Sequence, residues 1–399
     1  MNVLFICHRV PFPPKRGGKI RPFNIIRHLT SQGHRVTVAS MARTPQELEE
    51  SKGLSAYCNN QIVEVIRDWP ARRRMLFNVP TATPSSFGYF WSPALLRRIK
   101  IEVARQQPDL VFVHCSSVAP FAKDLLGVRK ILDYGDVDSQ KWREYAACRC
   151  FPLSAVFWLE ALKLERTERL LSLDADLCTC TTRAELESLQ ALGVNAAADW
   201  FPNGVDTDFF TPPGTQYDRR QIVFVGRMDY YPNQQAVKWF CAEVWPEMRR
   251  RFTDLHFLIV GADPPPSIEA LAEMAGVTVT GSVPDVRPFL GGAALSVAPL
   301  FIARGTQNKI LESLSIGTPV ICSRQASGGV DVLDGEHLVV ADTATDWIAR
   351  IEEILRSPAR RDELSRAGRA RVLSHHTWPA SMRRLDGMIT NVMRMKQSQ

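Results

Sequence analysis

The chain has 399 residues, of which 45% are hydrophobic and 23% charged, and its net charge is +7. This length is too great for one ordinary core and the composition is that of a globular protein, so two domains are expected and a low-complexity chain is excluded. No apolar run reaches the roughly 18 residues that cross a bilayer, so a transmembrane helix is not expected.

Short apolar runs in the first half predict the strands of a parallel sheet. They lie at residues 2–6, 35–40, 62–66, 110–114, 130–133 and 177–181, and helical patterns, as at 19–31, separate most of them. Alternating strands and helices are typical of a parallel sheet with helices on both faces. The first run has no basic leader before it, so we expect a strand there and not a signal peptide.

A second set of strands follows, and it predicts a second domain of the same kind. Its runs lie at 222–226, 255–261, 277–280, 294–299, 319–322 and 337–340, with helical patterns at 233–251 and 342–356. Proline and glycine interrupt the chain at Phe201-Pro202-Asn203-Gly204, which sets the predicted domains at 1–201 and 202–376. The last helix, within about 377–399, is expected to cross back to the first domain. Doubly wound domains bind ligands at the carboxyl ends of their strands.

Three residues of the first half lie where such a ligand site is expected. Gly17 and Gly18 follow the first strand and precede a helix, so the backbone there can approach a phosphate or a sugar closely, although a plain tight turn also explains them. His114 ends the strand 110–114 and is expected to face the same crevice. An ordinary buried histidine is the alternative.

Two groups of residues raise the question of a metal. Asp133, Asp136 and Asp138 could bind a cation or supply a base, but their spacing matches no EF-hand loop and helix capping competes. The Cys-x-Cys pairs at 148–150 and 178–180 do not have the usual zinc spacing, and the total of nine cysteines is odd. We therefore expect no metal, buried structural cysteines and a reducing cytoplasm.

In the second half, the stretch from Arg304 to Gly317 predicts an anion-binding loop that leads into a helix. Gly305 lets the backbone approach a ligand, and the free N–H groups and positive dipole of the helix start favour phosphate. Lys309 adds a positive charge there. Glu312 lies one turn further and could accept hydrogen bonds from sugar hydroxyls. Gly317 ends the helix.

Two further strand ends are candidate contacts of the same ligand. Arg227 follows Val225-Gly226 and could pair with a phosphate, or it could be an ordinary surface arginine. Gly281 follows the strand 277–280, and backbone groups of this turn could hold a nucleobase edge. A simple turn in which Asp285 caps the next helix is the alternative.

The charge is unevenly distributed between the two halves. Residues 1–199 hold 27 Lys and Arg against 20 Asp and Glu, whereas residues 200–399 hold 22 of each. The basic first half favours anionic partners such as a phosphorylated acceptor or an anionic membrane, or it is a solvated basic surface. Basic and apolar residues interleave at 69–77, near Trp91 and at 157–163, which suits peripheral membrane contact. For 157–163 an ordinary core helix with a basic outer face is favoured.

These motifs together resemble the retaining glycosyltransferases of family 4, which have the GT-B architecture. The resemblance is carried by Gly17-Gly18, Gly33-His34-Arg35-Val36, Asn203-Gly204-Val205-Asp206, Val225-Gly226-Arg227 and the stretch from Gly305 to Val320. It is closest to the bacterial exopolysaccharide sugar transferases associated with PEP-CTERM/exosortase systems. It implies two Rossmann-like domains that face a cleft.

The resemblance also implies a reaction and a set of roles. A sugar would pass from a nucleotide-sugar donor to a glycan or a polyprenyl-diphosphate-linked acceptor with retention, without a cofactor or a metal. Glu312 would hold the donor ribose, Arg227 and Lys309 the diphosphate, and His114 would lie near the donor sugar. The remaining donor contacts would come from Gly17, Gly18, Gly281, Arg304, Gly305, Thr306, Gln307 and Asn308. The enzyme would be cytoplasmic, with contact to the inner face of the membrane.

The sequence departs from the family pattern at two positions. The first Glu of the E-x7-E motif is replaced by Arg304, and the usual Lys six residues after Arg227 by Asn233. Lys309, at the helix start, is expected to replace the missing phosphate charge. Arg304 cannot act as a carboxylate, so we hypothesise that it recognises an acidic sugar or an anionic acceptor.

Three other functions remain open on sequence grounds. An inverting transferase or epimerase of the same fold would use an Asp or Glu of the first domain as base. A non-catalytic assembly partner would keep the fold without turnover, and Arg304 and Asn233 are the features that favour it. A nucleic-acid-binding protein has only the basic first half in its favour, and the neutral second half argues against it.

Overall fold

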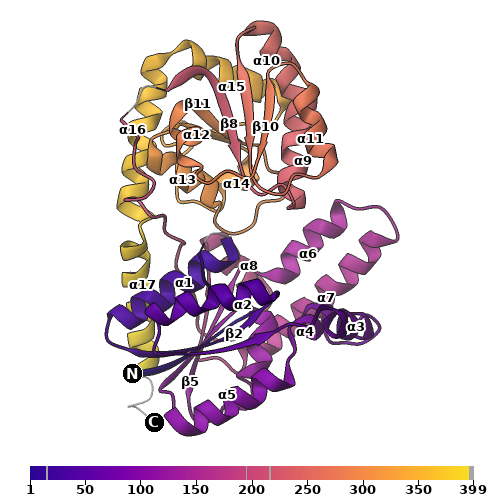
Figure 1. Ribbon diagram of the computed structural model, residues 1–399, viewed down its shortest axis with the longest axis vertical. Coiled ribbons are helices and arrows are strands. Elements are labelled where there is room, and N and C mark those ends of the chain that lie inside the picture. Colours follow the sequence, from indigo (N-terminus) through magenta and orange to yellow (C-terminus); the bar gives the residue numbers. More distant parts are fainter. Residues whose placement is uncertain (15–16, 195, 215–216, 395–399) are drawn as a thin grey trace. The chain divides into compact units, whose positions relative to one another are not determined.

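The computed structural model describes residues 1–14, 17–194, 196–214 and 217–394. The chain forms two compact units, one of Met1–Phe201 with the chain from Met382 onward and one of Pro202–Ser381 (Figure 1). Residues 395–399, at the end of the predicted crossing helix, lie outside the described ones. Each unit contains one parallel sheet, which confirms the predicted fold class.

The sheet of the first unit has seven described strands in the order β3-β2-β1-β4-β5-β6-β7. They are β1 (Asn2–Cys7), β2 (Arg35–Ala42), β3 (Asn60–Val65), β4 (Leu110–His114), β5 (Arg129–Gly135), β6 (Leu177–Cys180) and β7 (Ala198–Trp200). The strand order reverses between β1 and β4, which is where doubly wound sheets bind ligands. The edge strand β7 was not predicted, because its three residues are only half-buried and form no apolar run.

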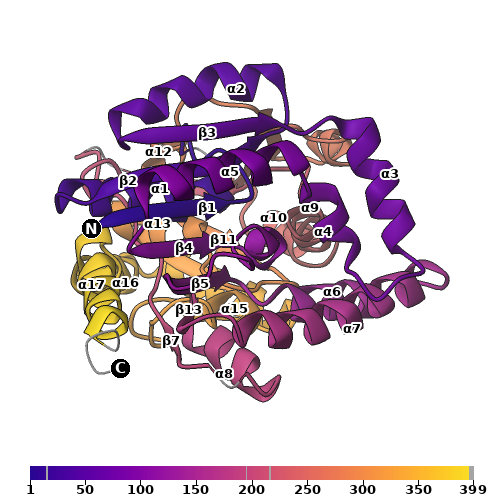
Figure 2. The same cartoon turned by 90° about the horizontal axis from the view of Figure 1, so that it is seen from below.

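Helices separate most of these strands. They are α1 (Gly17–Ser31), α2 (Pro45–Ser51), α3 (Asp68–Asn78), α4 (Ser85–Phe90), α5 (Pro93–Gln106), α6 (Asp138–Ala147), α7 (Leu153–Ser172) and α8 (Arg183–Ala191). Figures 1 and 2 show α6 and α7 side by side as a helical hairpin. None of the described helices is long and apolar enough to span a membrane.

The second unit has a sheet of six described strands in the order β10-β9-β8-β11-β12-β13. They are β8 (Asp218–Val225), β9 (His256–Val260), β10 (Val277–Gly281), β11 (Ala293–Ala298), β12 (Val320–Cys322) and β13 (Val339–Val340). The order reverses between β8 and β11, and both strands are buried along their final residues. The helices of this unit include α9 (Tyr231–Trp239), α10 (Trp245–Arg251), α11 (Pro266–Glu269), α12 (Arg287–Gly292), α13 (Asn308–Ile316), α14 (Arg324–Ser327), α15 (Ala344–Arg356) and α16 (Pro358–His375). Helix α17 (Trp378–Arg394) begins in the second unit and belongs to the first from Met382 onward.

The single helix predicted at 233–251 is interrupted. A π-helical turn, Phe240–Val244, separates α9 from α10. Pro246 lies in the first turn of α10 and has no backbone N–H, and its ring clashes with the carbonyl four residues earlier in a regular helix. The wider turn accommodates the proline, as kinks of this kind usually do.

Helix α7 contradicts the prediction of a core helix with a basic outer face at 157–163. Trp158 and Leu159 are 53% and 42% exposed, whereas Glu160 and Lys163 are buried. The Glu160 carboxylate accepts hydrogen bonds from the N–H groups at the start of α4, and the Lys163 ammonium donates to the carbonyls of Asn78 and Val79 at the end of α3. The charges are buried because they satisfy helix termini, and the apolar side chains are left outside.

The expectation of buried cysteines is only partly confirmed. Cys178 and Cys180 are buried in β6, but Cys148 and Cys150 are exposed. The exposed pair lies at the turn between α6 and α7. Cys148 and Cys150 are therefore exposed because they lie in a loop, although free cysteine is usually a buried residue type.

Glu168 on α7 gives a stability prediction that depends on pH. Its side chain is fully buried; the N–H of Ser139 donates to one carboxylate oxygen, and the other oxygen has no partner among the described residues. Burial raises the pKa of Glu168 to about 8. Between the ordinary pKa near 4.5 and this value, the folded protein holds a proton that the unfolded chain has lost, so stability falls as pH rises.

We expect Glu168→Gln to raise Tm by an amount that grows from pH 5 to pH 9, because the amide stays neutral throughout. Thermal unfolding at both pH values measures this difference. The matched control is Glu187→Gln, at an exposed position of α8, which should leave Tm unchanged at both. A gain of the same size at the two pH values would contradict the assignment.

Candidate active site

At the carboxyl edge of the second sheet, two strand ends touch through their backbones. Gly226 follows β8 and Gly261 follows β9, and a Cβ atom on Gly261 would lie 1.8 Å from the Gly226 carbonyl oxygen. A Cβ atom on Gly226 would lie 3.0 Å from the Lys309 ammonium. A side chain at position 261 would therefore clash with the backbone, whereas one at position 226 would displace the Asn233 and Lys309 side chains. The lysine ammonium thus lies against the loop that follows β8.

Lys309 reaches this loop from the first turn of α13. Its Nζ atom donates to Asn233 Oδ1 at 2.7 Å and lies 4.2 Å from the centre of the Phe224 ring. The Asn233 side-chain amide in turn donates to the Arg227 carbonyl. Burial lowers the pKa of Lys309 to about 7, although the charge of Glu312 acts in the opposite direction. The Lys309 ammonium thus lies beside Asn233, and residue 233 is the position at which the family 4 pattern has a lysine.

The loop before α13 holds polar atoms that the protein itself does not satisfy. Gly305 has φ +64°, and a Cβ atom on Gly329 would lie 1.9 Å from its carbonyl oxygen, so the two loops pack backbone to backbone. Thr306 Oγ1 and Asn308 Oδ1 are buried without a hydrogen-bond partner in the described residues. Unmade hydrogen bonds of buried groups are costly. A bound ligand that supplies partners would remove this cost.

Glu312 lies on the same helix, one turn after the orphaned side chain of Asn308. It is half-buried, and no hydrogen bond or ion pair engages its carboxylate in the described part of the chain. Burial raises the pKa of Glu312 to about 7, and the charge of Lys309 opposes this shift. The carboxylate is thus free to accept hydrogen bonds from hydroxyl groups.

Arg227 lies at the predicted strand end, but it is already paired. Its guanidinium donates to Asp229 at 2.8 and 3.0 Å and also to Asp263. Asp263 has φ +57°, a conformation in which Asp is tolerated better than most residues. A phosphate at Arg227 would compete with these two carboxylates. Neither ion pair of Arg227 was predicted from the sequence, and Asp263 lies 36 residues away from it.

The remaining predicted residues of this unit have simpler surroundings. Gly281 has φ +66°, and a Cβ atom there would meet nothing within 4 Å. Asp285 accepts a hydrogen bond from the N–H of Arg287, the first residue of α12, which supports the helix-capping alternative. Gln307 donates to the Arg304 carbonyl at 3.1 Å, so this pair closes the turn before α13.

In the first unit, Asp133 is the centre of a buried network at the carboxyl end of β5. Arg21 of α1 donates to both of its carboxylate oxygens at 2.9 Å, and Thr179 donates to one of them. His114 Nδ1 lies 2.7 Å from Asp133 Oδ2. This contact keeps the proton on Nδ1 and leaves Nε2 of a neutral His114 as an acceptor. The aspartate, considered earlier as a base or metal ligand, orients the histidine instead.

Next to His114 lies a second histidine that sequence reasoning missed. The His8 ring, at the end of β1, is 5.9 Å from the His114 ring, and its Nδ1 atom is buried without a partner in the described residues. Burial and then the charge of His114 lower the pKa of His8. The sequence signal that could have identified His8 is its position directly after the first strand, at the edge of the sheet where ligands are expected. Gly17 and Gly18 begin α1 and are exposed.

The other aspartates of this edge are engaged by the protein. Thr181 donates to Asp136 at 2.9 Å, and Ser116 donates to Asp138 at 3.4 Å. Among the described residues, no three His, Cys, Asp or Glu side chains are grouped so that they could hold a metal ion.

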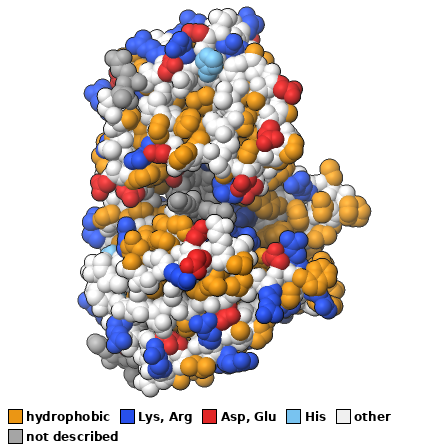
Figure 3. Space-filling model, in the orientation of Figure 1, with side chains coloured by type: hydrophobic (Ala, Val, Ile, Leu, Met, Phe, Trp, Pro, Cys, Tyr) orange, Lys and Arg blue, Asp and Glu red, His pale blue; other side chains and the backbone are white. Residues whose placement is uncertain are grey.

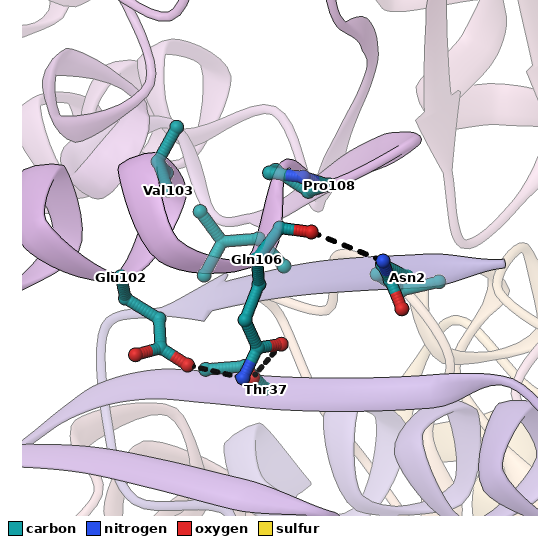
Figure 4. A pocket seen from close by; sticks show the side chains of 8 residues that line it. Asn2, Thr37, Glu102, Val103, Gln106 and Pro108 are labelled. Carbon is teal, nitrogen blue, oxygen red and sulfur yellow. Dashed lines mark hydrogen bonds between the residues drawn. The ribbon is translucent and has the colours of Figure 1, made fainter.

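At the opposite, amino end of the first sheet lies a small cavity of about 10 Å³. Figure 4 shows the side chains that line it. Gln106 of α5 donates to Glu102 and accepts from Thr37, while its carbonyl accepts from Asn2 (Figure 4). A cavity of this size holds no more than a water molecule. These residues therefore form a structural hydrogen-bond network at the amino end of the sheet.

Two protein family models match the chain in succession. The model described as Glycosyltransferase Family 4 matches residues 16–209, and the one described as Glycosyl transferases group 1 matches residues 219–357. The first match includes His114 and the strands β2 to β7 but not β1, and the second includes the glycine loops and α13.

Individual relatives agree with the family models. A GDP-mannose-dependent alpha-(1-6)-phosphatidylinositol monomannoside mannosyltransferase of Mycolicibacterium smegmatis is 29% identical over 259 residues, which are 56% of this chain and 65% of that protein. The chain thus spans just under two thirds of that relative's length.

Among solved structures, sucrose-phosphate synthase of Thermosynechococcus elongatus has a TM-score of 0.76 at 16% identity, over 99% of this chain and all of that one. Anabaena HepE in complex with UDP has a TM-score of 0.69 at 12% identity, over 98% of this chain and all of that one. At these identities the likeness shows the shared fold.

Proposed function

We propose that this chain, which has the GT-B glycosyltransferase fold and matches two glycosyltransferase family models in succession, transfers a sugar from a nucleotide-sugar donor to a glycan or lipid-linked acceptor. The transfer retains the anomeric configuration and serves exopolysaccharide biosynthesis at the inner face of the cytoplasmic membrane. The mannosyltransferase relative and the UDP complex of HepE support a nucleotide-sugar donor. No metal or cofactor takes part in this proposal.

The observation that carries the proposal is the set of groups around the start of α13. The Lys309 ammonium, the orphaned Thr306 and Asn308 side chains and the free N–H groups of the helix start all suit an anion. A departing nucleoside diphosphate gains negative charge in the transition state, and fixed donors lower the barrier most when they face that charge. Glu312 holds the ribose hydroxyls of the same ligand.

A donor panel tests this proposal on wild type and on Arg304→Glu. We expect one class of nucleoside-diphosphate sugar to raise Tm, because a ligand that binds only the folded state stabilises it. Arg304→Glu should shift the preference between uronic and neutral sugars, whereas Arg350→Glu, at an exposed position of α15, should not. Unchanged preference would refute a role for Arg304. Absence of any nucleotide-dependent shift or turnover would favour the non-catalytic assembly partner.

An inverting transferase is a second candidate, and the pairing of His114 with Asp133 favours it. A histidine that a buried carboxylate orients can act as a general base towards an acceptor hydroxyl, which an inverting reaction needs. Nuclear magnetic resonance of the product's anomeric proton decides between the two. Retention supports the first candidate, and inversion supports the second, in which His114 is the candidate base.

A further inference from the structure

The first unit contains a groove of about 530 Å³ between α3, α4 and α7. This volume is within the usual range for small-molecule sites. Most of its surface is apolar, and the side chains that the argument uses are Phe77, Phe87, Trp91, Leu170 and the arginines Arg74 and Arg166. No acidic side chain lies among the described residues that line it. The groove therefore suits a ligand with both a hydrocarbon part and a negative charge.

The walls of the groove are held in place by buried charges. The Lys163 ammonium binds the carbonyls of Asn78 and Val79 at 2.9 and 2.6 Å, which fixes the end of α3. The Glu160 carboxylate binds the N–H of Ser85 at 2.7 Å, which fixes the start of α4. Arg74 Nε donates to the Gly88 carbonyl and joins the two helices. The groove is thus formed before any ligand arrives, so little ordering cost opposes binding.

Apolar side chains of the groove are open to solvent. Phe77 is 66% exposed and Leu170 is 51% exposed. Figure 3 shows hydrophobic and basic side chains interleaved on the side where Figure 1 places α3 and the α6–α7 hairpin. Large exposed apolar patches of this kind mark interaction sites. No hydrogen bond or ion pair engages Arg166 within the described ranges, so its charge is available.

Trp91 of the groove and the adjacent residue Phe90 place the groove near the buried histidines. Trp91, which lines the groove, stacks on Phe121 at 5.3 Å, and its neighbour Phe90 meets the His8 ring edge to face at 5.5 Å. His8 in turn lies 5.9 Å from His114. A chain lying in the groove would therefore have its head group close to the carboxyl edge of the first sheet.

We propose that this groove binds the hydrocarbon chain of a lipid-linked acceptor, with Arg166 and Arg74 facing the phosphate that joins the chain to the acceptor's head. The head then lies towards His8 and His114. This inference rests on the proposed function, since it identifies the acceptor of that reaction as an anionic long-chain lipid. Charge complementarity supports this occupant, because the described residues that line the groove include Arg74 and Arg166 and no acidic side chain.

Direct binding of pyrene-labelled dodecyl phosphate tests the groove without any need for turnover. Phe77→Glu and Leu170→Glu place a carboxylate in the groove at exposed positions, so both variants should fold. We expect each to raise Kd by about tenfold or more. Leu126→Glu is the matched control, because Leu126 is 87% exposed in the same unit and does not line the groove.

The contribution of the charge is measured with Arg166→Gln. This variant should weaken binding of the labelled dodecyl phosphate but leave the affinity for pyrene-labelled dodecanol unchanged. Equal Kd values for Leu170→Glu, Leu126→Glu and wild type would overturn the proposal. So would groove variants that lose binding to phosphatidylglycerol vesicles yet keep their affinity for the dodecyl phosphate, because the surface would then dock on a bilayer.

The nucleotide thermal-shift assay separates this inference from the proposed function. Phe77→Glu and Leu170→Glu should keep the wild-type response to the donor, since the groove lies in the first unit and α13 in the second. Loss of the dodecyl phosphate site with an intact donor response supports an acceptor-binding role. A chain that binds the dodecyl phosphate but no nucleotide would refute the glycosyltransferase proposal, and with it the identification of the acceptor.

Discussion

Replacing Lys309 by alanine should lower kcat/KM by about 10²-fold or more. The Lys309 ammonium is fixed by Asn233 and the Phe224 ring and lies directly below the loop after β8. A preformed charge in a half-buried site stabilises a leaving diphosphate strongly, and removal of one such donor costs about 10²- to 10³-fold. Steady-state kinetics with the preferred donor measures the loss, and near-normal activity would refute the assignment.

A matched control and an exchange sharpen this experiment. Lys238→Ala removes an exposed lysine of α9 that donates to Ser267, and it should leave kcat/KM unchanged. Since Lys309 and Asn233 touch, the double variant Asn233→Lys/Lys309→Asn moves the ammonium to the position of the family's lysine. It should recover most of the activity that Lys309→Asn alone loses. Failure of the exchange, with both single variants inactive, would mean that the side-chain positions are not equivalent.

Asp133→Asn is expected to have the second large effect, on stability and on activity. The Asp133 carboxylate is fully buried, and its two oxygens accept hydrogen bonds from Arg21, His114 and Thr179. Removing one partner of a buried ion pair leaves the Arg21 charge uncompensated, which costs about 3–5 kcal/mol. The amide also no longer holds the proton of His114 on Nδ1. Denaturant unfolding measures the first effect and kcat/KM the second.

The pH dependence gives this prediction a definite sign. Burial alone would raise the pKa of Asp133, but Arg21 and the hydrogen bond from His114 hold it well below its usual range. Such a carboxylate stabilises the fold above the pKa of the unfolded chain, and this contribution is lost as pH falls. The stability difference between wild type and Asp133→Asn should therefore shrink below about pH 4. A difference that is independent of pH would contradict the ion pair.

Kinetic measurements on a His114→Ala variant distinguish two roles of Asp133, the positioning of His114 and the structural support of the fold. If Asp133 acts through His114, Asp133→Asn should lower kcat/KM much less when His114 is already alanine. A structural defect would instead lower activity equally in both backgrounds. Asp136→Asn is the control, because Asp136 lies on the same edge and accepts a hydrogen bond from Thr181.

Periodicity and glycine placement predicted much of the fold. All twelve predicted strands are present, because buried parallel strands form uninterrupted apolar runs that local sequence reveals. The edge strand β7 and the interruption at Phe240–Val244 were missed. The first has no apolar run, and the second depends on how one proline is accommodated.

Only those parts of the candidate site whose residues are close together in the sequence could be predicted. Lys309 and Glu312 share one helix with the glycine loop, so their grouping follows from spacing. The contact of Lys309 with Asn233 joins residues 76 positions apart, and that of Arg21 with Asp133 joins residues 112 apart. Such contacts arise from strand order, which single-sequence patterns do not encode. The buried Glu160 and Lys163 of α7 were misassigned for the same reason, since their partners are backbone groups of α3 and α4.

The exposed turn between α6 and α7 has a practical consequence. Cys148 and Cys150 are the two exposed cysteines, whereas the others are buried apart from the half-buried Cys115, whose pKa burial raises to about 12. Maleimide dyes should therefore label the hairpin tip selectively, with no need to engineer a cysteine. In air the same thiols can join two copies by a disulfide. A dimer that disappears with reductant would then record oxidation during handling and not a native assembly.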